Sequence, residues 1–192
     1  METSASLLDR LRHSGQPEDW QQLLDIYTPL IRNWLRRYSA SEQDAEDVVQ
    51  EVLAVVVRKL PLFERERIGS FRSWLRTISV NCLRDSWRRD RFRPNAAGGS
   101  DFRMVLEQWE DPGSELSQLW NEQHDQHVLQ ALLEQIRPNI NDTTWQAFRR
   151  TAIDNEPATE VAADLGLTVN QVYIARSRTM ARLREIGQGL IE

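Results

Sequence analysis

The chain of 192 residues has a formal net charge of −5, with 40% hydrophobic and 28% charged residues, so it has room for one medium or two small domains and is too apolar to be disordered throughout. A single cysteine, Cys82, excludes an internal disulfide framework and a four-cysteine zinc site, and three histidines argue against any structural metal site. No apolar run reaches the roughly 18 residues of a membrane span and the N-terminal segment has no signal-peptide character, so we expect a soluble, cytoplasmic protein without membrane insertion.

The first half of the chain has apolar residues at helical spacing. Residues 4–13 and 18–38 carry such stripes, and Pro29 is expected to kink or divide the second segment. Ser41 begins a further helix with acids in its first turns and bases in its last, and Pro61 ends it. The valine-rich centre of this segment would suit a strand, but its flanks and its acid-to-base polarity favour a helix.

Ser70 follows a loop and caps a helix that we expect to continue to about residue 91. The Pro, Gly and Ala content of residues 93–101 then indicates a domain boundary. A second helical block begins near Ser114 and ends before Pro138. The next helix starts at Asn141 or Asp142, and shorter patterns predict helices over residues 157–165 and 169–186.

The sequence therefore predicts an all-α fold of two small helical domains joined by a flexible acidic linker. The predicted parts are a first domain over residues 1–93, a linker over 94–125 whose end merges into a helix, and a second domain over 126–192.

Charge is segregated along the chain. Residues 39–51 carry five acids and no base, whereas residues 84–93 carry five arginines against two aspartates. Residues 101–127 carry seven acids and one arginine, and residues 169–184 carry four arginines and no acid. Arginine suits phosphates and guanine edges, although a GC-rich genome would also favour it over lysine. Two basic blocks separated by an acidic one predict two nucleic-acid contacts held apart by a linker.

Residues 157–184 have the pattern of a helix-turn-helix. Gly166 supplies the turn, and Ala162 and Ala163 allow two helices to approach closely. The predicted shared core consists of Val161, Leu165, Leu167, Val172 and Ile174. The start of the second helix would face base edges in the major groove. An ordinary helical hairpin with a solvated basic face is the alternative, and the four arginines without an acid favour DNA.

Two segments resemble known protein regions. QDAEDVVQEVLAVVV (residues 43–57) and FERERIGSFRSWLRTISVNCLRDSWRR (residues 63–89) resemble the second conserved region of bacterial RNA polymerase sigma factors, most closely those of the extracytoplasmic-function group. Residues 157–184 resemble the fourth conserved region. The order and spacing of these segments suit a two-domain sigma factor, and the resemblance covers nearly the whole chain.

The resemblance implies that the acidic helix docks on the clamp helices of the β′ subunit of core RNA polymerase. The residues that match this role are Asp44, Glu46, Asp47, Gln50 and Glu51. Acids without a base would repel DNA and attract arginines of a protein partner. Acids at a helix start also stabilise the helix dipole, an alternative that is compatible with docking.

Residues 63–91 match the family's reader of the −10 promoter element, which melts DNA and captures a flipped base. An unstacked base needs aromatic walls and polar groups at its edge. The implied site residues are Phe63, Phe71 and Trp74 as walls, Ser70, Arg72 and Asn81 as polar groups, and Arg84, Arg88, Arg89 and Arg91 at phosphates. Core packing is the alternative for Phe71 and Trp74, and it is favoured for Trp74, which shares a helical stripe with Ile78.

The second helix of the helix-turn-helix is implied to read the −35 element. Its site residues are Thr168, Asn170, Gln171, Tyr173, Ile174, Arg176, Arg178 and Arg182. Arg176 and Arg178 stand about 200° apart around a helix of 3.6 residues per turn, so they cannot face the same groove edge. We expect Gln171 and Arg178 to include a base contact, with Arg176 nearer to phosphate or the polymerase.

The expected function is that of a promoter-specificity subunit, which binds core polymerase through its β′ and β subunits, recognises −35 and −10 elements and assists DNA opening. In the family the linker threads into the polymerase cleft, although its composition favours a disordered tether in the free chain. An anti-sigma factor is a further candidate partner. We expect no cofactor, no metal site and no catalytic residue, since Glu122, His124 and His127 lack an accompanying nucleophile or phosphate loop.

Two other functions account for part of the sequence only. A stand-alone helix-turn-helix regulator would usually be a dimer on a palindromic site, and it leaves DAEDVVQEV and residues 63–91 unexplained. A structural helical scaffold leaves the charge segregation without a purpose.

Overall fold

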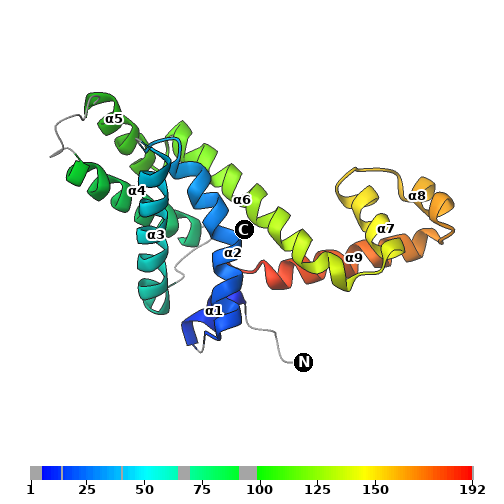
Figure 1. Ribbon diagram of the computed structural model, residues 1–192. Coiled ribbons are helices and arrows are strands. Elements are labelled where there is room, and N and C mark those ends of the chain that lie inside the picture. Colours follow the sequence, from blue (N-terminus) through cyan, green and yellow to red (C-terminus); the bar gives the residue numbers. More distant parts are fainter. Residues whose placement is uncertain (1–5, 14, 40, 65–69, 91–98, 192) are drawn as a thin grey trace. The chain divides into compact units, whose positions relative to one another are not determined.

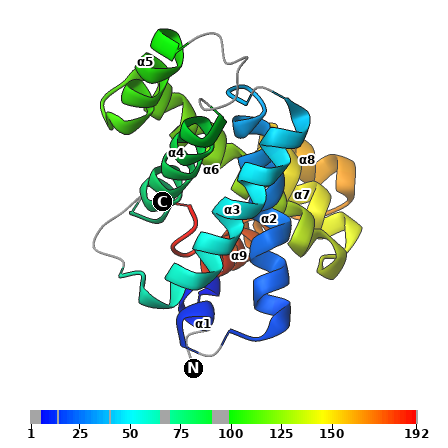
Figure 2. The same cartoon turned by 60° about the vertical axis from the view of Figure 1, so that its left-hand side comes forward.

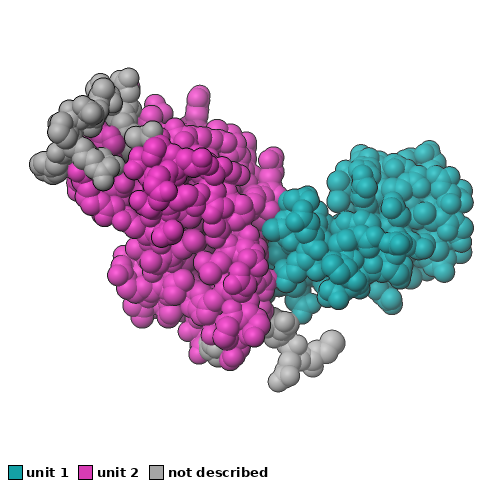
Figure 3. Space-filling view, in the orientation of Figure 1, with its two compact units in different colours: residues 1–4, 129–188 teal, residues 5–128, 189–192 magenta. Residues whose placement is uncertain are grey.

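A computed structural model describes residues 6–13, 15–39, 41–64, 70–90 and 99–191. All helices and strands assigned in these ranges are helices (Figure 1). This confirms the predicted all-α class. The chain forms two compact units (Figure 3). The N-terminal unit is Ala5–Val128 with Gly189–Glu192, and the C-terminal unit contains Leu129–Gln188.

The N-terminal unit contains α1 (Leu7–His13), α2 (Pro17–Leu35), α3 (Glu42–Lys59), the short helix η1 (Leu60–Leu62), α4 (Ser70–Asp90), α5 (Gly99–Glu110) and the first part of α6 (Glu115–Ile136). Figure 2 shows α3 alongside α2 and α4, which both pack against it. Pro29 lies within α2, so the predicted division is absent. Ser41 caps α3 by accepting a hydrogen bond from the Asp44 amide (3.1 Å), and the valine-rich segment is helical, as predicted.

Aromatic side chains dominate the core of the N-terminal unit. Trp34 of α2 stacks on Trp109 of α5, with ring centroids 5.2 Å apart, and meets Trp120 of α6 edge-on at 5.1 Å. All three tryptophans are fully buried. Burial of aromatic rings contributes most of the apolar area in a core of this kind, and offset or edge contacts add to it. Helices α5 and α6 are therefore integral to this unit.

The predicted flexible linker is wrong for the described part of residues 94–125. Residues 94–98 lie outside the described ranges, and the remainder forms α5, a turn and the start of α6. The acidic composition suggested a solvated tether, but acids such as Glu107, Glu115 and Glu122 are exposed while Leu106, Trp109 and Trp120 are buried. The burial of these three large apolar side chains offsets the conformational entropy that is lost when the segment becomes ordered.

The C-terminal unit contains the end of α6, the short helix η2 (Arg137–Asn139), α7 (Asp142–Ala152), α8 (Ala158–Leu165) and α9 (Val169–Ile186). Asn141 caps α7 through the Thr144 amide (2.8 Å). Gly166 ends α8 in the left-handed conformation, at φ +64°. That conformation is strained for residues with a Cβ, so the predicted role of this glycine is confirmed.

A small core joins α7, α8 and α9. Its buried residues are Ala147, Val161, Ala162, Val172 and Ala175, with Leu165 and Leu167 partly buried at its edge. Ile174 is 40% exposed, so its predicted place in this core is wrong. The small residues bring the helices close together, and Arg150 of α7 pairs with Asp164 of α8 (2.8 Å).

Candidate protein- and nucleic-acid-binding surfaces

The acidic segment of α3 is partly neutralised by arginines from α2. Glu46 accepts two hydrogen bonds from Arg32 (2.5 and 3.0 Å) and lies 3.9 Å from Arg36. The hydrogen bond from Arg32 holds the pKa of Glu46 below its ordinary value. Residues 39–51 contain no base, but the fold supplies two, so Glu46 is engaged within the chain.

Two of the other predicted core-binding residues also have partners within the chain. Asp44 lies at the helix start, where its carboxylate accepts from the Ser41 hydroxyl (2.6 Å). Glu51 pairs with Arg89 of α4 (2.6 Å). Asp47 and Gln50 are exposed, and Asp47 accepts a hydrogen bond from the neutral Gln43 (3.0 Å) with no ion-pair partner among the described residues. The outer face of α3 that remains open to a partner is therefore centred on Asp47 and Gln50.

The aromatic residues predicted to read the −10 element form one cluster. Phe63 lies 5.0 Å from Trp74 and 5.7 Å from Phe71, measured between ring centroids. Phe71 is 2% exposed and contacts Tyr27 of α2, so core packing describes it. Trp74 keeps partial exposure, contrary to the expectation that it is the core residue of this pair. Residues 65–69, which complete this loop, lie outside the described residues.

The polar residues of α4 are largely occupied by other side chains. Arg72 pairs with Asp125 of α6 (2.6 Å), and Arg84 pairs with Glu110 of α5 and donates to Asn81 (3.2 Å). Arg88 lies 3.7 Å from Asp85. Ser70 is half-buried, Asn81 is exposed, and Arg91 lies outside the described residues. The fold therefore brings α5 and α6 carboxylates to the predicted DNA-binding residues.

Arg76 is a functional candidate that sequence reasoning missed. It is 5% exposed, and its Nη1 has no hydrogen-bond partner among the described residues. Burial, followed by the like charge of Arg72, lowers the pKa of Arg76, and only the carboxylate of Asp111 opposes this. Its i, i+4 spacing from Arg72 on one helix face was a signal in the sequence.

A buried polar chain connects α2, α6 and α4. The Nδ1 of His124 lies 2.9 Å from the Asp125 carboxylate, and its Nε2 lies 3.3 Å from the Tyr27 hydroxyl. An ionised Asp125 places the imidazole proton on Nδ1, so Nε2 accepts from Tyr27. His127 Nε2 lies 2.7 Å from the Ile26 carbonyl. Both histidines thus attach α6 to α2, while Glu122 is exposed.

Burial and hydrogen bonding shift the pKa values of Tyr27, His124 and Asp125 in this buried polar series. Burial raises the pKa of Tyr27 far above its ordinary value and lowers that of His124. Burial also opposes ionisation of Asp125, but the hydrogen bonds from His124 and Arg72 outweigh it and lower that pKa. No group of three or more His, Cys, Asp or Glu suited to a metal ion occurs in the described part of the chain.

Stability is expected to fall as pH drops below the ordinary His124 pKa of 6.5. The unfolded chain then binds a proton that the folded chain resists, so this contribution is present above 6.5 and is lost until the lowered folded pKa is reached. Urea unfolding across pH 5–7 should show the slope, and His124→Gln should reduce it. The exposed His13, changed to Gln, is the control, and equal slopes in all three proteins would contradict the assignment.

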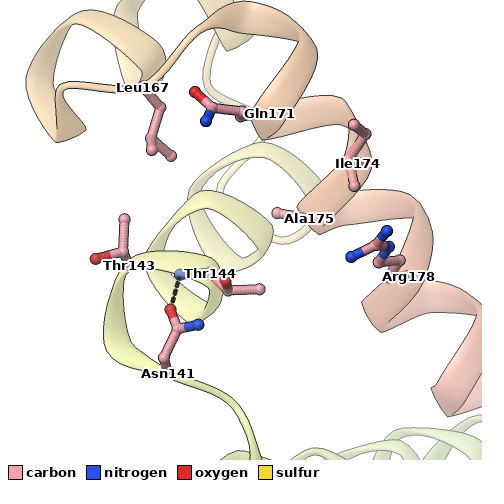
Figure 4. Close-up of a pocket in the computed structure, with 8 residues that line it drawn as sticks. All are labelled: Asn141, Thr143, Thr144, Leu167, Gln171, Ile174, Ala175 and Arg178. Carbon is pink, nitrogen blue, oxygen red and sulfur yellow. Dashed lines mark hydrogen bonds between the residues drawn. The ribbon is translucent and has the colours of Figure 1, made fainter.

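Helix α9 carries Arg178 and Arg176 on different faces. Gln171, Ile174 and Arg178 line a pocket of about 340 Å³ together with Asn141, Thr143 and Thr144 at the start of α7 (Figure 4). Arg176 does not line it, which agrees with the predicted separation of Arg176 from Arg178. The other predicted −35 residues are all exposed: Thr168, Asn170, Tyr173 and Arg182.

Gln171 has a structural role that the sequence pattern did not reveal. Its Oε1 accepts from the Thr168 amide (2.8 Å) and hydroxyl (3.0 Å), while Thr168 Oγ1 accepts from the Gln171 amide (3.2 Å). This capping box fixes the start of α9. The side-chain oxygen of Gln171 is occupied by these bonds. Its side-chain NH2 group is therefore the part that can donate to a base edge.

Comparison with known proteins gives the context for these surfaces. Residues 23–93, from within α2 through α4, match the sigma-70 region 2 family. The ECF RNA polymerase sigma factor SigE of Mycolicibacterium smegmatis is 26% identical over 184 residues, covering 95% of this chain and 67% of SigE. RNA polymerase sigma factor CnrH of Cupriavidus metallidurans is 27% identical over 174 residues, covering 88% of this chain and 87% of CnrH.

A third relative, the ferric citrate uptake sigma factor FecI of Escherichia coli, is 25% identical over 89% of this chain and 93% of its own length. A solved structure of CnrH in complex with the cytosolic domain of CnrY aligns at 24% identity and a TM-score of 0.38 over 92% of each chain. None of the helices in the described ranges has the length and apolar character that a bilayer crossing requires. With region 2 matched across α2–α4 and sigma factors aligned over most of its length, the chain is similar to RNA polymerase sigma factors of the ECF type.

Proposed function

We propose that this chain binds core RNA polymerase, recognises −35 and −10 promoter elements and assists DNA opening. The observation that carries the proposal is the opposite charge of the two helices within the matched region. Helix α3 leaves Asp47 and Gln50 exposed for a protein partner, and α4 carries a series of arginines suited to phosphates. A protein contact and a DNA contact are thus placed on adjacent helices of one unit.

In the proposed division of roles, α3 docks on the β′ clamp helices and α4 contacts the −10 element. Trp74, which is partly exposed, is the aromatic surface for a flipped base, and Asn81 supplies a hydrogen bond to its edge. Phe63 and Phe71 hold Trp74 in place from the core side. Helix α9 of the C-terminal unit contacts the −35 element.

The proposal is tested by a pull-down with core RNA polymerase, followed by transcription from a promoter library with permanganate footprinting. A promoter-specificity subunit forms a 1:1 complex with core and yields melted DNA only in that complex. A stand-alone regulator would bind duplex DNA as a dimer without core. Sequence-specific duplex binding by the free chain, with no affinity for core, would therefore overturn the proposal.

Changing Arg178 to Ala is expected to relax one position of the −35 preference, at a cost of roughly 1–3 kcal/mol for a lost base contact. Arg178 lines the pocket beside Gln171, whereas Arg176 faces elsewhere. Arg176→Ala should weaken binding to all promoter sequences alike and lower the slope of log affinity against log salt concentration by about one unit. A library selection with both variants measures this, and an altered preference with Arg176→Ala alone would reverse the assigned orientation of α9.

A further inference from the structure

The α5–α6 hairpin, defined as residues 99–128, covers the arginine-bearing face of α4. Asp125 of the hairpin pairs with Arg72 (2.6 Å), and Trp120 donates its indole N–H to the Arg72 carbonyl (3.3 Å). At the other end of α4, Glu110 pairs with Arg84. Two predicted DNA contacts are thus held by carboxylates of one segment, over the α4 length from residue 72 to residue 84.

These ion pairs compete directly with phosphate. Carboxylate and phosphate oxygens use the same guanidinium N–H donors in the same planar geometry. An Arg72 bound to Asp125 or an Arg84 bound to Glu110 cannot offer those donors to DNA at the same time. The hairpin carboxylates and the phosphates of a nucleic-acid strand therefore compete for these donors.

Two features of the N-terminal unit have opposite effects on the packing of the hairpin. Arg76 is buried at 5% exposure, with its Nη1 unpartnered among the described residues. Burying a charge without a close counter-ion costs free energy, whereas Trp109 and Trp120 packed on Trp34 favour closure.

We propose that the α5–α6 hairpin is an autoinhibitory strap whose carboxylates hold Arg72 and Arg84 of α4 in the free chain and give them up to phosphates when DNA binds, while the hairpin itself stays packed through Trp109 and Trp120. The inference rests on the proposed function, because it takes Arg72 and Arg84 as DNA contacts. It adds that the acidic segment between the family-like regions regulates the first domain by occupying its nucleic-acid face.

Removing the two carboxylates tests the strap in the full-length chain. Glu110→Gln with Asp125→Asn should raise the affinity for a fluorescent single-stranded oligonucleotide by roughly 3- to 30-fold, as expected for two partly exposed ion pairs. The salt slope should steepen by about 1.4 units if two further phosphates are contacted. Glu107→Gln with Glu122→Gln is the matched control, since both acids are exposed on the hairpin and change the net charge equally. An equal gain in the control, or no gain in the test pair, overturns the strap.

A second measurement separates this proposal from the proposed function. Arg72→Ala and Arg84→Ala are assayed for promoter opening with core polymerase. If they impair opening while the double carboxylate variant leaves DNA affinity unchanged, the strap is wrong and the function stands. If neither arginine variant affects opening, the DNA-binding role of α4 is wrong.

Discussion

Asp47→Lys is expected to reduce affinity for core RNA polymerase by roughly 100-fold or more, because a like charge placed at a complementary interface costs several kcal/mol. Asp47 is the informative residue because it is exposed and, in the described part of the chain, its carboxylate is hydrogen-bonded to the neutral Gln43 and forms no ion pair. Reversing Glu46 or Glu51 would break ion pairs with Arg32 or Arg89, so lost binding would also reflect altered folding. Fluorescence anisotropy of labelled chain against core at moderate salt measures the effect.

The matched control is Glu18→Lys, an exposed acid in the first turn of α2 that undergoes the same charge change. Far-UV circular dichroism should be the same for both variants and the parent. Wild-type affinity in Asp47→Lys would show that the outer face of α3 does not dock on the polymerase. Equal losses in both variants would indicate a general charge effect.

Trp120→Ala is expected to destabilise the N-terminal unit by about 3–5 kcal/mol, the usual cost of removing a buried aromatic side chain. Trp120 is fully buried, contacts Trp34 and Trp109, and donates a hydrogen bond to the Arg72 carbonyl. The variant loses the packing and the indole hydrogen bond and leaves a cavity. Urea unfolding followed by near-ultraviolet circular dichroism would report the loss.

Leu119→Ala is the control, since the neighbouring Leu119 is 40% exposed. Surface substitutions usually change stability by within about 0.5 kcal/mol. If α6 were the solvated tether that its composition suggests, both variants would behave like the control. A small effect of Trp120→Ala would therefore contradict the packing of α5 and α6 onto α2.

Apart from α5, the helices and several of their ends could be predicted from the sequence because their causes are local. Ser41 caps α3, Thr168 caps α9 and Gly166 ends α8 through interactions that reach three or four residues along the chain. The apolar stripe of α3 likewise faces inward as its spacing predicts. The exposed stripe of Gln171 and Arg178 also follows from helical geometry alone.

The packing of α5 and α6 was hidden by residue type. Within the N-terminal unit, the buried face of α6 is formed by Ser117, Trp120, His124 and Val128, and two of these four residues are polar. A hydrophobicity pattern does not detect such a stripe, and the surrounding acids suggest disorder. The repeated spacing of these four residues was the available signal. His124 is tolerated inside because Tyr27 and Asp125 satisfy both of its nitrogens.

Charge pairing across helices depended entirely on the tertiary structure. Arg32 and Glu46 are separated by a loop, and Arg84 and Glu110 lie on helices that are separated by residues outside the described ranges. The energy of an ion pair depends on distance in space and on desolvation, and neither can be calculated from separation along the chain. The sequence alone determined most of the helices, α5 excepted, and where charge is concentrated. Only the packing of the helices decided which of those charges remain open to a partner.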